Sequence, residues 1–103
     1  MAKATLILDQ RLDISERHRV ELKVFEVEPS ERFPDGIKVG FALLDIIDKV
    51  PRLLVDNHAP FGFHVHTELP KNKQARKPLA TKDYQEALDA FWRLVKELVE
   101  NED

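Results

Sequence analysis

The chain has 103 residues, of which 43% are hydrophobic and 34% charged, and its formal net charge is −3 at neutral pH. This length has room for one domain with one core, and the apolar runs exclude a disordered chain. The absence of cysteine excludes a disulfide scaffold, a thiol nucleophile and a cysteine-based zinc site. No window approaches the roughly 18 apolar residues of a membrane span, and no signal peptide is evident, so we expect a cytoplasmic protein.

The first two thirds of the chain predict β-strands, because short stretches are rich in β-branched or aromatic residues or alternate polar with apolar ones. These stretches are 3–12, 18–28, 37–47, 52–57 and 63–68. The alternation changes phase at Val24 and Phe25, which indicates a β-bulge or a strand covered on both faces. Residues 29–36 hold two prolines and an Asp-Gly pair and predict a loop. Pro51 is expected to keep residues 49–51 out of the sheet, since proline has no N–H to donate.

The last third predicts a loop and then a helix. Residues 70–78 are basic and bounded by prolines, which is typical of a loop. Over 81–100, with Thr81 as the N-cap, apolar residues recur at helical spacing. They are Tyr84, Ala87, Leu88, Phe91, Trp92, Val95, Leu98 and Val99. The strand connections are too short for parallel crossovers. We therefore expect a single α+β domain over 1–103: a mostly antiparallel sheet of four to five strands packed against one long C-terminal amphipathic helix, with Phe91 and Trp92 in the core.

Three of the four histidines, His58, His64 and His66, fall within nine residues. If 63–68 is extended, His64 and His66 point to the same side of the strand. A turn at 59–62 then brings Asp56 and His58 opposite them on the neighbouring strand. The sequence therefore predicts a surface cluster of imidazoles and one carboxylate.

This cluster has three interpretations, and the spacing alone does not choose between them. Two histidines can act as acid and base in phosphodiester cleavage. Asp56, His64 and His66 could instead hold a divalent metal, since His-x-His on a strand is a chelating geometry. The third interpretation is a set of polar side chains on a solvated sheet face.

The basic residues at 71–77 and Gly62, which lie near the histidines in the sequence, each allow a functional and a purely structural interpretation. Lys71, Lys73, Arg76 and Lys77 lie in seven residues without an acid, so they could bind substrate phosphates or simply form a solvated loop. Gly62 either permits the close approach of a ligand or serves a turn that needs glycine.

Several stretches together resemble the TumE-like family, small prokaryotic proteins classed as toxins of toxin–antitoxin modules. The stretches are Lys-Ala-Thr-Leu-Ile-Leu-Asp at 3–9, Val-Asp-Asn-His at 55–58, Gly-Phe-His-Val-His-Thr at 62–67 and Phe-Trp at 91–92. The resemblance extends over about residues 3–99, and its specific parts are the short block from Asp56 to His66 and the Phe91-Trp92 pair.

The resemblance implies the toxin of a type II toxin–antitoxin module, whose partner is a DNA-binding antitoxin. By analogy with other small toxins, the function would be RNA cleavage, with His64 and His66 as acid and base, Asp56 and His58 beside them, and the 71–77 loop binding RNA. The alternative is a non-catalytic protein-binding module that acts through the sheet face or the C-terminal helix. An open sheet also has unpaired edges, which allow a homodimer.

Overall fold

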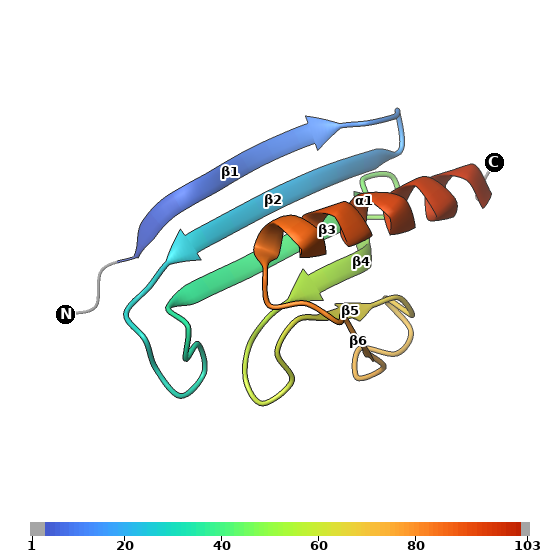
Figure 1. Ribbon diagram of the computed structural model, residues 1–103. Helices are drawn as coiled ribbons and strands as arrows, with labels where there is room; N and C mark the ends of the chain where they lie inside the picture. The colour runs from blue at the N-terminus through green and yellow to red at the C-terminus, as the bar shows by residue number, and fades with distance from the viewer. Residues whose placement is uncertain (1–3, 102–103) are drawn as a thin grey trace.

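Six antiparallel strands follow one another in a meander, and one helix lies against the sheet (Figure 1). The computed structural model describes residues 4–101. The elements are β1 (Thr5–Asp13), β2 (His18–Glu26), β3 (Ile37–Asp45), β4 (Val50–Asp56), β5 (His64–His66), β6 (Lys77–Pro78) and α1 (Tyr84–Asn101). The predicted α+β fold is confirmed, with one strand more than expected.

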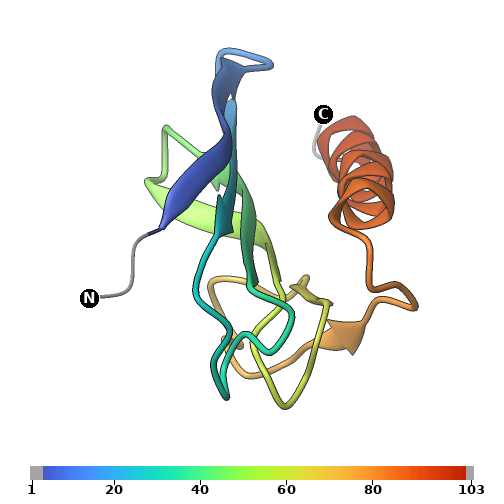
Figure 2. The same ribbon diagram turned by 60° about the vertical axis from the view of Figure 1, so that its left-hand side comes forward.

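The two faces of the sheet have different surroundings, because successive side chains of a strand point to opposite sides. One row of paired residues belongs to the hydrophobic core beneath α1: Leu22, Phe41, Val55 and Val65. The adjacent row lies on the other face: Lys23, Gly40, Asp56 and His64. Figure 2 shows the sheet nearly edge-on, with α1 on one side only. We call the side of Lys23, Gly40, Asp56 and His64 the open face.

The helix begins later than predicted, because Asp83 and not Thr81 is its N-cap. A carboxylate oxygen of Asp83 accepts the backbone N–H of Gln85 at 2.8 Å, which satisfies one of the free donors of the first turn. Thr81 lies two residues earlier, and its hydroxyl oxygen accepts the backbone N–H of Asp83 at 3.0 Å. In the described residues, no helix is both long and apolar enough to cross a membrane.

Three details of the sheet differ from the sequence prediction. The bulge lies in β1, at the register shift between Leu6 and Leu8, and not in β2. Pro51 belongs to β4, where it pairs with Leu44 beside a second register shift, a place where the missing N–H is tolerated. The predicted loop 70–78 contains β6, whose two residues pair with β5 at the sheet edge. Lys3, assigned to the first strand, lies outside the described residues.

The core is centred on the contact between α1 and β3. Phe41 and Phe91 are fully buried, and their ring centroids are 5.9 Å apart. Phe91 is thus in the core as predicted, whereas Trp92 is only partly buried at its edge. Most of the attachment of the helix therefore depends on a narrow stripe of buried residues, namely Ala87, Phe91 and Val95.

We expect Phe91→Ala to lower the free energy of unfolding by about 3–5 kcal/mol, because it removes a buried ring and leaves a cavity. Urea denaturation followed by circular dichroism measures the change. Ile47→Ala is the matched control: this side chain is 61% exposed, so its loss should change stability by less than about 0.5 kcal/mol. Equal effects of the two substitutions would show that α1 does not depend on this contact.

Candidate functional site

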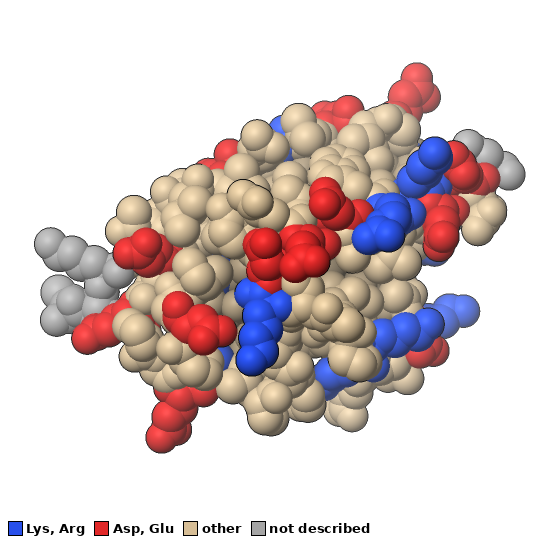
Figure 3. Space-filling view, viewed as in Figure 1, with Lys and Arg blue, Asp and Glu red and all other residues tan. Residues whose placement is uncertain are grey.

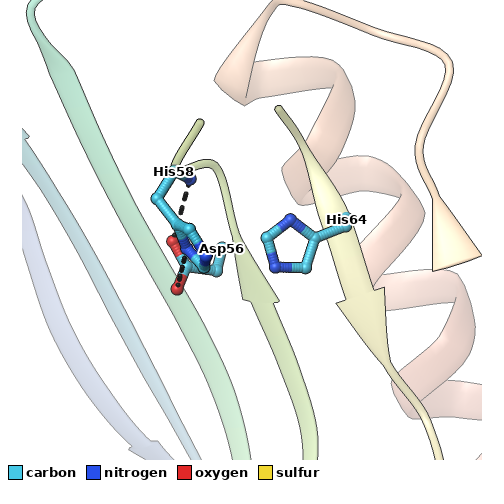
Figure 4. Close-up of side chains that lie close together, drawn as sticks. All are labelled: Asp56, His58 and His64. Carbon is cyan, nitrogen blue, oxygen red and sulfur yellow. Dashed lines mark hydrogen bonds and ion pairs between the residues drawn. The ribbon is translucent and has the colours of Figure 1, made fainter. Parts of the chain in front are cut away.

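The histidines and the carboxylate meet on the open face at the ends of β4 and β5. Asp56 is the last residue of β4 and pairs with His64 across the ladder. The ring centroid of His64 lies 5.0 Å from that of His58 and 5.1 Å from that of His66. Figure 4 shows the imidazole of His64 pointing from β5 toward Asp56 and His58. The structure therefore brings together all four residues that the sequence placed in one cluster.

Asp56 and Asn57 hold the start of the following turn. One carboxylate oxygen of Asp56, Oδ1, accepts the backbone N–H groups of Asn57 at 2.7 Å and His58 at 3.2 Å. The side chain of Asn57 accepts the N–H of Val39 at 2.9 Å and donates to the carbonyl of Ile37 at 2.8 Å. The turn is thereby tied to β3. The second carboxylate oxygen, Oδ2, then faces His58 Nδ1 at 3.0 Å.

The imidazole of His64 is almost inaccessible, with 1% of the residue exposed. Its Nδ1 donates to the carbonyl of Gly62 at 2.7 Å, a bond that assigns the lone pair to Nε2 in the neutral ring. Nε2 is buried and has no hydrogen-bond partner within residues 4–101. Burial lowers the pKa of His64 below its ordinary value of 6.5, against the opposing effect of the hydrogen bond to Gly62. His64 is therefore neutral at pH 7 and presents an unused lone pair.

His66 is also buried, with 8% of the residue exposed, and its Nδ1 lies 3.2 Å from the carbonyl oxygen of Ala75. The loop between β5 and β6 thus covers this ring. Asp56 and His58 are the more accessible members, since both side chains are only partly buried. The interpretation as a solvated sheet face is therefore wrong for His64 and His66, although both do lie on one face as predicted.

Of the four basic residues at 71–77, Arg76 is connected to the histidine cluster through the ring of Phe61. The guanidinium of Arg76 lies 3.9 Å above the ring of Phe61, and that ring meets the edges of His58 and His64 at 5.6 Å each. Two other predicted phosphate-binding residues, Lys71 and Lys73, are exposed in the loop, and Lys77 pairs with Val65 in the sheet.

Gly62 serves a turn and not a close approach. Its φ is +65°, which side chains rarely adopt, and a Cβ built there would meet no atom within 4 Å. The turn interpretation is therefore the better one, and the carbonyl of Gly62 contributes by orienting His64.

A pocket of about 500 Å³ lies on the open face and has Asp56 in its lining. The strands leave room for the pocket because Gly40 has no side chain and Ala42 has only a methyl group. Three cationic residues, two phenylalanines and, besides Asp56, a second acid surround it: Lys23, Arg32, Lys38, Phe25, Phe33 and Glu21. These residues were not predicted from the sequence, although the polar side of the strand 18–28 was a usable signal. On the helix side, acidic and basic side chains are mixed (Figure 3).

The lowered pKa of His64 makes stability depend on pH. Below about pH 6.5 the unfolded chain takes up a proton that the folded protein resists, so the free energy of unfolding should fall as the pH decreases. The contribution is at most about 1.4 kcal/mol per pH unit. Urea denaturation between pH 7.5 and 5.5 in EDTA should show a smaller slope for His64→Gln than for the wild type. Identical slopes would contradict the assignment of this proton to His64.

Comparison of the chain with protein-family models, with curated proteins and with solved structures found no match. The resemblance to the TumE-like family therefore depends on the residues quoted for it above. The function of this site must be inferred from its geometry.

Proposed function

We propose that this protein is an RNA-cleaving enzyme and acts as the toxin of a type II toxin–antitoxin pair. One observation carries the enzymatic part: Asp56, which belongs to the cluster with His58, His64 and His66, also lines a pocket that contains three cationic side chains. Imidazoles supply proton transfer near neutral pH, and cations bind phosphate. The toxin role comes from the family resemblance.

The pocket has the chemistry for a short single-stranded segment. Arg32 and Lys38 place their charges 5.9 and 6.0 Å from the centre of the Phe33 ring. Aromatic rings accept stacked bases, and the neighbouring cations can bind the phosphates on either side. The pocket volume of about 500 Å³ is in the range of small-ligand sites. RNA bases become available for such stacking in loops and single strands, because in a duplex they are stacked on one another.

The cluster fits cleavage by the 2′-hydroxyl of RNA. A base removes the 2′-hydroxyl proton, the 2′-oxygen attacks the adjacent phosphorus, and an acid protonates the departing 5′-oxygen. The products are a 2′,3′-cyclic phosphate and a 5′-hydroxyl end. The unprotonated Nε2 of His64 serves as the base. A metal ion held by this nitrogen would instead lower the pKa of the 2′-hydroxyl. His66 is the acid, and Arg76 stabilises the added negative charge on the oxygens of the pentavalent phosphorane.

A second function, binding a partner without catalysis, is favoured by β1. This edge strand exposes large apolar residues, among them Leu6, Ile7 and Leu12 at 48%, 44% and 41%. An exposed edge of this kind suits a partner chain or a second copy of this one. The net charge of −3 complements a basic, DNA-binding antitoxin. Antitoxin binding through β1 is compatible with catalysis on the open face.

We expect the purified protein to cleave a mixed pool of cellular RNA, and the double variant His64→Ala/His66→Ala, which lacks the proposed base and acid, to lose activity by at least about 100-fold. Gel electrophoresis of the RNA and detection of cyclic phosphate ends measure both. His18→Ala is the control, because His18 lies at the other end of the sheet, beside Ser15 and paired with Asp45. Full cleavage by the double variant with an unchanged melting temperature would refute the enzymatic proposal.

Lys23→Ala and Lys38→Ala test the pocket. We expect each to raise KM for a short RNA about 10-fold with little change in kcat, and to lower the salt dependence of binding by about one charge. Arg93→Ala, an exposed cation on α1, should change neither quantity. If all three substitutions have the same effect, the pocket does not bind the RNA.

A further inference from the structure

Three donor groups of the cluster surround one point. One donor atom from each of Asp56, His58 and His64 lies within 4.8 Å of the other two. With metal–ligand bonds of about 2.0–2.2 Å, the donors of a tetrahedral site lie about 3.3 Å apart. A contraction of roughly 1.5 Å at the widest point would therefore turn this cluster into a metal site. The side chains of His58 and Asp56 are only partly buried, so they are not fully enclosed by packing.

Independently of these distances, Nε2 of His64 is buried and has no hydrogen-bond partner within residues 4–101. A buried polar atom without a partner destabilises the folded protein, so its persistence calls for a ligand or a function. Nδ1 of the same ring donates to the Gly62 carbonyl, the arrangement by which proteins orient a metal-binding histidine and leave Nε2 free.

His58 and Asp56 also have side-chain atoms that could bind a ligand. Nδ1 of His58 is buried and makes no hydrogen bond within residues 4–101, although Oδ2 of Asp56 lies 3.0 Å away. The other carboxylate oxygen of Asp56 is engaged by two backbone N–H groups, which hold the carboxylate in place. His64 and Asp56 are thus each held by hydrogen bonds through one atom, and the second donor atom of each remains for a ligand. Nδ1 of His58 faces Oδ2 of Asp56, so a cation could be shared between them.

We propose that Asp56, His58 and His64 bind one divalent transition-metal ion of the Zn²⁺ or Co²⁺ type. Two imidazoles and one carboxylate suit these ions, whereas Mg²⁺ and Ca²⁺ require oxygen ligands throughout. The structure thereby changes the ligand set that the sequence suggested, because His58 takes the place of His66. Nδ1 of His66 faces the carbonyl of Ala75, and the three donor atoms that lie within 4.8 Å of one another come from Asp56, His58 and His64.

Three protein ligands leave a coordination position for a fourth group, which is typical of catalytic and not of structural zinc sites. Asp56 also lines the pocket, so a phosphate bound there lies next to the metal. A metal ion at this place polarises a phosphate oxygen. This last step rests on the proposed RNA cleavage, but metal binding itself does not.

The experiment is a titration of EDTA-treated, desalted protein with Co²⁺ and with Zn²⁺. Visible absorption reports the coordination of Co²⁺, and calorimetry gives the stoichiometry and affinity for Zn²⁺. We expect one ion per chain, and binding weakened at least about 10-fold by Asp56→Asn or His58→Ala. Asp56→Asn keeps an oxygen for the two backbone N–H groups, so the turn should persist. His66→Ala is the matched control and should keep the affinity, with His66→Gln as a substitute if the alanine variant melts early.

Two results would overturn the proposal. One is a metal affinity of the wild type no higher than that of the double variant Asp56→Asn/His58→Ala. The other is an equal loss of metal affinity in His66→Ala and His58→Ala. RNA cleavage assayed with and without EDTA separates this proposal from the preceding one. Metal binding without any cleavage supports the site and refutes the enzyme. If cleavage persists in EDTA and still requires His64, the protein is an RNA-cleaving enzyme and the metal ion has no role in the cleavage.

Discussion

The pairing of β4 with β5 is the constraint on which both the core and the site depend. Val55 pairs with Val65 on the helix side, and Asp56 pairs with His64 on the open face. Because side chains alternate along a strand, a slip of one residue would exchange these two sets. It would place polar side chains beneath α1 and turn Val65 away from the core. The stability of the hydrophobic core therefore holds the polar cluster in register without any contact between the two.

Hydrogen bonds at the end of β4 convert this register into a defined site. The side chain of Asn57 bridges to β3 through Val39 and Ile37, and Asp56 closes the turn that carries His58. Beyond that turn, the positive φ of Gly62 aims its carbonyl at the His64 ring. Each functional side chain is thus positioned by a neighbour that performs no chemistry itself. Such support by surrounding groups is a general requirement of catalytic and metal sites.

Polar groups are buried in two places, and the two differ in how well they are satisfied. At the other end of the sheet, the buried Asp45 accepts hydrogen bonds from Arg17, Ile47 and Asp48, and this network joins the β1–β2 and β3–β4 turns. Hydrogen bonds from Asp48 and Arg17 hold the pKa of Asp45 below its ordinary value. The histidine cluster, in contrast, keeps buried nitrogens without partners. A satisfied network stabilises a fold, whereas an unsatisfied one beside a pocket is typical of a site that meets a ligand.

The sequence by itself determined the fold class, the helix face and the grouping of the histidines, because these follow from local periodicity. Alternation in β2 and β3 and the helical spacing from Tyr84 to Val99 are visible in the chain, and so is the shared face of His64 and His66. Three features depended on tertiary structure. The loop between β5 and β6 folds over His66, His58 replaces His66 beside Asp56, and Lys23, Arg32 and Lys38 form a pocket from separate segments. Burial, and the distances between residues far apart in sequence, arise only when strands and loops pack together.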